Sequence, residues 1–143
     1  MAKKKSSLDE LVKEGLVVPG NSDVLQYSRI PFNIEILDNL IGGGIPRKRI
    51  TLLYGVSNTG KSYLASQIVR SVQALGGSAA WIDAEWSWDA SWMSKCGIDV
   101  SKVLVSQPED GESAFSVVRE VMKGGSDVVV VDSVAGLYPA QLN

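Results

Sequence analysis

The chain has no histidine and a single cysteine, Cys96, among its 143 residues. Any site built by this chain alone therefore has no imidazole to act as a base or a metal ligand. A single cysteine excludes an internal disulfide and fits a reducing compartment. No apolar run approaches the roughly 18 residues of a membrane-spanning helix, and the N-terminus lacks the apolar region of a signal peptide. We therefore expect a cytoplasmic protein with no membrane partner.

An excess of one charge is also missing. The chain has 14 Lys and Arg against 16 Asp and Glu, which gives a formal net charge of −2. The sequence therefore has no global basic field of the kind that attracts nucleic acid, although a local basic site stays open as an alternative. The length suits one domain with a real core.

The most informative stretch is a glycine-rich loop. The apolar residues 50–54 are expected to form a strand, and apolar residues at 64, 68, 72 and 75 recur with helical spacing. Between them lies G-x-x-x-x-G-K-S, the phosphate-binding P-loop pattern when it joins a strand to a helix. Glycines let such a loop turn tightly, so that its backbone N–H groups point at phosphate oxygens beside a helix N-terminus.

This loop predicts a site for a nucleoside triphosphate and Mg²⁺. We expect Lys61 to reach the β- and γ-phosphates and Ser62 to give its hydroxyl to Mg²⁺. A turn that merely connects a strand to a helix is the alternative. The expected phosphate-binding residues are Gly55, Val56, Ser57, Asn58, Thr59, Gly60, Lys61 and Ser62.

The rest of the chain alternates expected strands and helices. Strands are expected at residues 79–82, 103–105 and 128–131, and apolar spacing predicts helices at 32–41 and 111–123. The valine run at 128–131 shows no polar alternation, which is typical of a strand covered on both faces. The alternation of expected strands and helices along the chain predicts an α/β fold with a mostly parallel sheet flanked by helices.

Carboxylates follow two of these expected strands. Asp132 ends the valine run, as in the Walker B pattern that holds Mg²⁺. Glu85 follows the second strand and is the candidate to position or deprotonate an attacking water. Asp83 is an alternative for that role if the chain stays extended. Ordinary surface acids at strand ends are the competing interpretation for each of them.

Several short motifs in register resemble the bacterial and phage RecA recombinases. Besides the glycine-rich loop they are Gly-Gly-Gly-Ile-Pro at 42–46, Ile-Asp-Ala-Glu at 82–85, Gln-Pro at 107–108 and Asp-Ser-Val at 132–134. The resemblance runs from about Arg29 to the last residue. It implies a P-loop NTPase of RecA type that uses ATP and Mg²⁺, polymerises on single-stranded DNA and exchanges strands with homologous duplex DNA.

The resemblance also implies roles for individual residues. Glu85 is then the catalytic carboxylate, Lys61 acts on the phosphates, and Asp132 is the Walker B acid. Asp89 and Trp92 fall where the family contacts adenine, with Trp92 in place of the usual tyrosine. A tryptophan face can stack on a base at least as well. Gln107 is either a polar group that reports on the site or a turn amide.

Two segments are expected. Residues 1–28 form an N-terminal arm with a short helix that Ser7 could cap, and by position the arm resembles the family's subunit-joining segment. Residues 29–143 form the N-terminal part of the ATPase core, which we expect to be incomplete at its C-terminal side and unable to exchange strands alone. The cell compartment is then bacterial cytoplasm, or host cytoplasm for a phage protein. A ring ATPase or helicase and a non-catalytic nucleotide-binding fragment are the alternatives.

Overall fold

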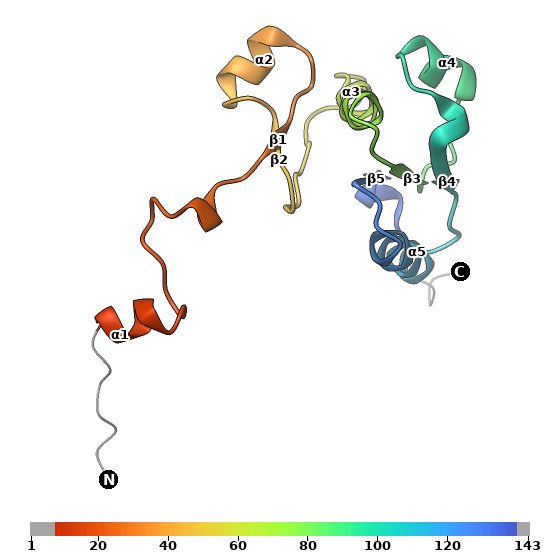
Figure 1. Ribbon diagram of the computed structural model, residues 1–143. Helices are drawn as coiled ribbons and strands as arrows, with labels where there is room; N and C mark the ends of the chain where they lie inside the picture. The colour runs from red at the N-terminus through yellow and green to blue at the C-terminus, as the bar shows by residue number, and fades with distance from the viewer. Residues whose placement is uncertain (1–7, 140–143) are drawn as a thin grey trace.

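The computed structural model describes residues 8–139 and has an α/β arrangement around a parallel sheet (Figure 1). In the sheet β3 (Ala79–Asp83) lies between β4 (Val103–Ser106) and β5 (Val128–Asp132), and it pairs in parallel with both. The expected strands at 79–82, 103–105 and 128–131 are therefore confirmed, as is the parallel sheet.

Helices cover both faces of this sheet. Figure 1 shows α3 (Lys61–Ala74) on one side and α5 (Gly111–Lys123) on the other. The helix expected at 111–123 is confirmed to the residue, with Asp110 as its N-cap. The core beneath α3 is built from apolar side chains of α3, β3, β4 and the region of α4 (Ala90–Lys95), namely Val69, Ala79, Trp81, Val103, Met93 and Ile98.

A small hairpin lies before the glycine-rich loop. In it β1 (Arg29–Ile30) pairs antiparallel with β2 (Ile45–Pro46), and α2 (Glu35–Leu40) lies between them in sequence. The helix is shorter than the expected 32–41 because the Asp38 carboxylate accepts hydrogen bonds from the amides of Phe32 and Ile34, at 2.8 and 3.2 Å. These bonds hold the entry to the helix in a turn.

The N-terminal arm stands apart from the sheet (Figure 1). It contains α1 (Leu8–Lys13), which has no buried residue, and the 3₁₀ turn Asp23–Leu25. Two further 3₁₀ turns, Val100–Lys102 and Val134–Gly136, lie in the body. Ser7, the expected cap of the first helix, lies outside the described residues.

The expected strand at residues 50–54 is wrong. The segment pairs with no strand in the described part of the chain, and Ile50, Leu52 and Tyr54 are 100%, 71% and 88% exposed. Only Leu53 packs inward, against the apolar cluster of Ile30, Phe32, Ile68 and Val72. An apolar run becomes a strand only where a neighbouring strand offers hydrogen-bonding partners.

The expectation for the valine run is also wrong in one respect. All five residues of β5 are half-buried rather than covered on both faces. Within residues 8–139 the sheet order is β4-β3-β5, so β5 is an edge strand. An edge strand of this length presents unpaired backbone groups to its surroundings.

Candidate functional site

Three expected functional segments lie toward the same edge of the sheet. Asp83 and Asp132 are partners in the register of β3 and β5, so both strands end at this edge. The helix α3 ends just before β3 begins, and Val72 near its end packs in the cluster that reaches Val128, the first residue of β5. The first turn of α3 therefore points to the carboxyl edge, where ligands bind in open parallel sheets.

The glycine-rich loop enters α3 through Gly60, its N-cap, which has the left-handed φ of 89°. Asn58 is also left-handed, with a φ of 62°. The Thr59 hydroxyl donates to the Val56 carbonyl at 2.8 Å and closes the turn. Residues 55–60 are all exposed, so the loop presents its backbone to solvent.

Several backbone N–H groups of this loop have no acceptor within residues 8–139. Within residues 8–139, none of the amides of residues 57–60 donates to a protein acceptor, whereas Leu64 N–H donates to Gly60 as α3 begins. The Lys61 ammonium group folds back and donates to the carbonyls of Gly55 and Val56 at 3.2 and 2.9 Å. The loop thus combines unpaired N–H groups, a helix N-terminus and a cation, which together suit an anion.

Glu85 is fixed next to the end of β5. The Ser133 hydroxyl donates to the Glu85 carboxylate, and the amide of Ala84 donates to the Asp132 carbonyl at 2.9 Å. A Cβ added to Gly136 would lie 3.0 Å from the Ala84 carbonyl oxygen, so the turn after β5 approaches this loop closely. Glu85 itself is exposed, so its carboxylate is available to a ligand.

Asp83 lies two residues earlier and is bonded differently. Its residue is only 1% exposed, and its carboxylate accepts from Ser87, Trp88 and Gln107. Burial acts to raise the pKa of Asp83, but the hydrogen bonds from Gln107, Ser87 and Trp88 together outweigh it and leave the pKa below its usual value. Both oxygens of the buried Asp83 carboxylate thus accept hydrogen bonds from the protein, whereas Glu85 is exposed.

Asp89 and Trp92, the residues expected to contact adenine, lie at the start of α4. Asp89 is the N-cap of α4, and its Oδ1 accepts from the amides of Ser91 and Trp92 at 2.8 and 3.0 Å. Trp92 is 39% exposed, whereas Trp81 is buried in the core and meets Trp88 edge-on, with the ring centroids 5.6 Å apart. Trp81 is therefore a core residue, and the face of Trp92 remains partly open.

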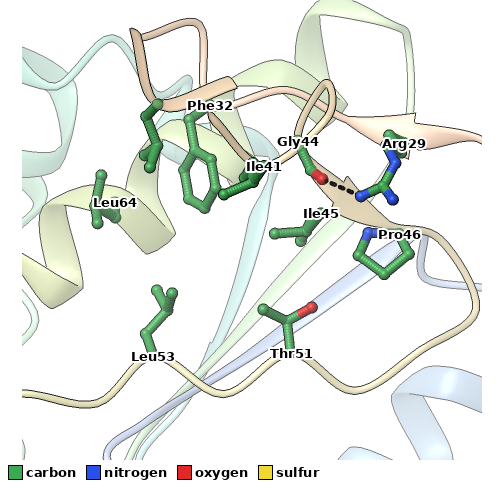
Figure 2. A pocket seen from close by; sticks show the side chains of 10 residues that line it. Arg29, Phe32, Ile41, Gly44, Ile45, Pro46, Thr51, Leu53 and Leu64 are labelled. Atoms are coloured by element: carbon green, nitrogen blue, oxygen red, sulfur yellow. Dashed lines mark hydrogen bonds between the residues drawn. The ribbon is translucent and has the colours of Figure 1, made fainter. Parts of the chain in front are cut away.

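An apolar pocket of about 290 Å³ lies elsewhere, beside the hairpin (Figure 2). Figure 2 shows Phe32, Ile41, Leu53 and Leu64 around it, and its one drawn hydrogen bond joins Arg29 to the Gly44 carbonyl. No residue of 55–60 and no strand-end carboxylate lines this pocket. The candidate site is therefore the carboxyl edge of the sheet.

Comparison with known proteins gives a family match. The family model described as RecA N-terminal domain matches residues 6–142. The chain therefore belongs to the RecA family.

Individual relatives extend the RecA match. Protein RecA of Herpetosiphon aurantiacus is 40% identical over 136 residues, which are 94% of this chain and 38% of that protein. Protein RecA of Chlorobium limicola is 43% identical over 120 residues, or 82% of this chain and 34% of the relative. Protein RecA of Mycoplasma mycoides is 41% identical over 129 residues, or 89% and 37%. The chain thus spans little more than a third of these relatives.

Sequence reasoning missed three residues of this candidate site. Ser133, Ser87 and Gly136 each contact the loop of Glu85 or bond Asp83, and no sequence pattern predicts such a contact for Ser87 or Gly136. The Asp-Ser-Val motif was the available signal for Ser133. Within residues 8–139 the structure has no group of three or more His, Cys, Asp or Glu side chains suited to hold a metal, and no helix long and apolar enough to cross a membrane.

Proposed function

We propose that the chain is the ATP-binding part of a DNA recombinase that forms filaments on single-stranded DNA and exchanges strands with homologous duplex DNA. One observation carries the proposal. The unpaired amides of residues 57–60 stand at the N-terminus of α3, toward the same sheet edge as Glu85 and Asp132. Membership of the RecA family supports the DNA-related part of the proposal.

The residues present fit ATP and Mg²⁺. The exposed loop amides and Lys61 would hold the phosphates, and Lys61 would leave its two carbonyl partners to do so. Ser62 and Asp132 supply the hard oxygen ligands that Mg²⁺ prefers. Bound there, Mg²⁺ would neutralise charge on the phosphates. Glu85, oriented by Ser133, would hold and deprotonate the attacking water.

Asp89 and Trp92 would form the base subsite. The hydrogen bonds that cap α4 use Oδ1 of Asp89, and Oδ2 accepts no hydrogen bond in the described part of the chain. This second oxygen can accept from an exocyclic amino group of adenine. The half-open face of Trp92 can stack on the ring.

Self-association is proposed for residues 1–28, with residues 29–143 as the ATPase core. The described part of the arm exposes apolar side chains, among them Leu8 at 77%. A six-residue helix such as α1 is not stable in water by itself, so it needs a surface to pack on. A neighbouring subunit in a filament would provide one. We place this assembly in the bacterial cytoplasm, or in host cytoplasm for a phage protein.

The nucleotide site is tested by titrating Mg-ATP into the chain and into Lys61→Ala. Loss of a cation at the phosphates is expected to weaken binding at least about tenfold, or roughly 1.4 kcal/mol. Lys123→Ala is the matched control, because Lys123 lies on α5 across the sheet and, within residues 8–139, bonds only Glu120. Equal affinities for the chain and Lys61→Ala would refute the proposed site.

Assembly separates a recombinase from a ring ATPase of the same core. In electron microscopy with single-stranded DNA and ATP, a recombinase that contains this part should form open filaments, whereas a ring helicase would close on itself. ATP hydrolysis that does not respond to single-stranded DNA would count against a recombinase.

A further inference from the structure

The Asp83 carboxylate, which the proposed chemistry does not use, binds the loop that carries Glu85. Its Oδ1 accepts from the amide and hydroxyl of Ser87 at 3.0 and 3.3 Å, and its Oδ2 accepts from the Trp88 amide at 2.9 Å. These bonds return the chain to the end of β3 only four and five residues after Asp83. Glu85 lies inside the turn that they close.

The fourth donor comes from another strand. Gln107 follows β4, and its Nε2 donates to Asp83 Oδ2 at 2.8 Å. Gln107 is itself exposed, whereas Asp83 is buried. A hydrogen bond to a buried charged group is among the stronger ones in proteins, so this contact can fix the carboxylate in one orientation.

The turn around Glu85 needs such support. Trp86 has a φ of 54°, a left-handed conformation that a bulky residue adopts only when its surroundings hold it. On one side the turn is held by Asp83, and on the other by the Ser133 hydroxyl and the Asp132 carbonyl. Glu85 therefore stands between two anchors, one of which, Asp83, also accepts a hydrogen bond from Gln107.

We propose that Asp83 and Gln107 form a clamp that orients Glu85, which makes Gln107 a positioning residue for the carboxylate of the neighbouring strand end. The inference rests on the proposed role of Glu85 in hydrolysis. It assigns Gln107 a task on the Glu85 loop that a turn amide would not have. A displacement of the segment after β4 would then change the orientation of Glu85.

The test compares Gln107→Met with the wild-type chain in the absence of nucleotide. Methionine keeps the length of the side chain but donates no hydrogen bond. We expect amide hydrogen exchange at Ser87 and Trp88 to become roughly three- to tenfold faster. The carboxyl ¹³C signal of Glu85, assigned by its absence in Glu85→Gln, should shift.

Gln73→Met is the matched control. The Gln73 amide donates to the Asp99 carbonyl at 2.9 Å and accepts from the Asp99 N–H at 3.0 Å, but Gln73 lies on α3 outside the Glu85 loop. It should leave the Ser87 and Trp88 amides and the Glu85 signal at their wild-type values. Any general loss of stability would appear in both variants.

Gln107→Glu places a second carboxyl beside Asp83, which should make amide hydrogen exchange in the Glu85 loop depend on pH. In the wild type the lowered pKa of Asp83 means that its bonds are lost only as the pH falls through that lowered value. In Gln107→Glu a proton shared by two carboxyls restores a bond at low pH, and two negative charges repel at high pH. The ratio of the Ser87 and Trp88 amide exchange rates in Gln107→Glu to those in the wild type should therefore rise between about pH 5 and pH 8. In Gln107→Met the same ratio should stay constant. Glu85, two residues after Asp83, and Asp132, its register partner in β5, are present in all three proteins and do not distinguish the variants.

The outcomes decide the inference without ATP. Faster exchange together with a shifted Glu85 signal supports the clamp. Unchanged exchange, or faster exchange with an unmoved Glu85 signal, overturns it, because Gln107 would then be a turn amide with no effect on Glu85. A wild-type chain that fails to bind Mg-ATP would instead refute the proposed function. The exchange rates and the Glu85 signal, measured without nucleotide, would still decide whether Gln107 orients Glu85.

Discussion

The loop at residues 55–60 and the loop at residues 83–88 serve the same edge of the sheet, yet they are held in opposite ways. The first is exposed, the amides of residues 57–60 have no acceptor within residues 8–139, and side-chain bonds from Thr59 and Lys61 to loop carbonyls close it. The second is bound at both ends, by Asp83 on one side and by the segment after β5 on the other.

The difference follows from what each loop has to present. A site for a phosphate needs donors that exchange water for an anion, so internal bonds would compete with the ligand. A carboxylate that aims at a water molecule needs one orientation, because misplacement by about 1 Å costs about a hundredfold in rate. We infer that the first loop functions through its backbone and the second through one aimed side chain.

The largest expected effect in this comparison is on turnover in Glu85→Gln. The amide keeps the shape of the side chain but cannot take a proton, so ATP hydrolysis should fall at least about a hundredfold. Mg-ATP affinity should stay close to wild type, because the proposed phosphate contacts lie on the other loop. Steady-state ADP formation and a binding titration measure the two effects. Equal turnover in both proteins would remove Glu85 as the catalytic carboxylate.

Much of this architecture was predictable from the sequence. The strands β3, β4 and β5 and the helix α5 have apolar patterns with the right period, and Gly124 marks the end of α5. The positions of Glu85 and Asp132 at strand ends follow from the same patterns. These elements are determined by local periodicity, which a single sequence carries.

Other features depend on long-range partners. Residues 50–54 have the pattern of a strand, but pairing is decided by a neighbouring edge that the local sequence does not specify. The bond from Gln107 to Asp83 spans 24 residues, and its choice over a solvent-facing amide follows from how β3 and β4 align. The sequence left both interpretations of Gln107 open for this reason.

A smaller effect is expected from Gly136→Ala, which tests how tightly the second loop is held. The new Cβ would lie 3.0 Å from the Ala84 carbonyl oxygen and 3.2 Å from Glu85 Cγ. The loop must shift by a few tenths of an ångström, which should lower the free energy of unfolding by about 1 kcal/mol. Urea denaturation measures the change.

Gly20→Ala is the control for this substitution. A Cβ on Gly20 meets nothing within 4 Å, so its unfolding midpoint should match wild type. The same midpoint in Gly136→Ala would mean that the segment after β5 does not restrain the Glu85 loop.

The smallest effect is expected at Asn58, in the first loop. Asn58 has a φ of 62°, which glycine adopts without steric cost, and Asn58→Gly keeps the backbone N–H. Stability should change by less than about 0.5 kcal/mol. Mg-ATP affinity should change by less than about threefold, because the proposed contact is made by the backbone.

Asn58→Val provides the contrast, since a β-branched residue at positive φ strains the loop and should weaken Mg-ATP binding. Isothermal titration of both variants measures the difference. A tenfold loss in Asn58→Gly alone would mean that the asparagine side chain contacts the nucleotide. The first loop would then bind through an aimed side chain, as the second does, and the contrast between the two loops would fail.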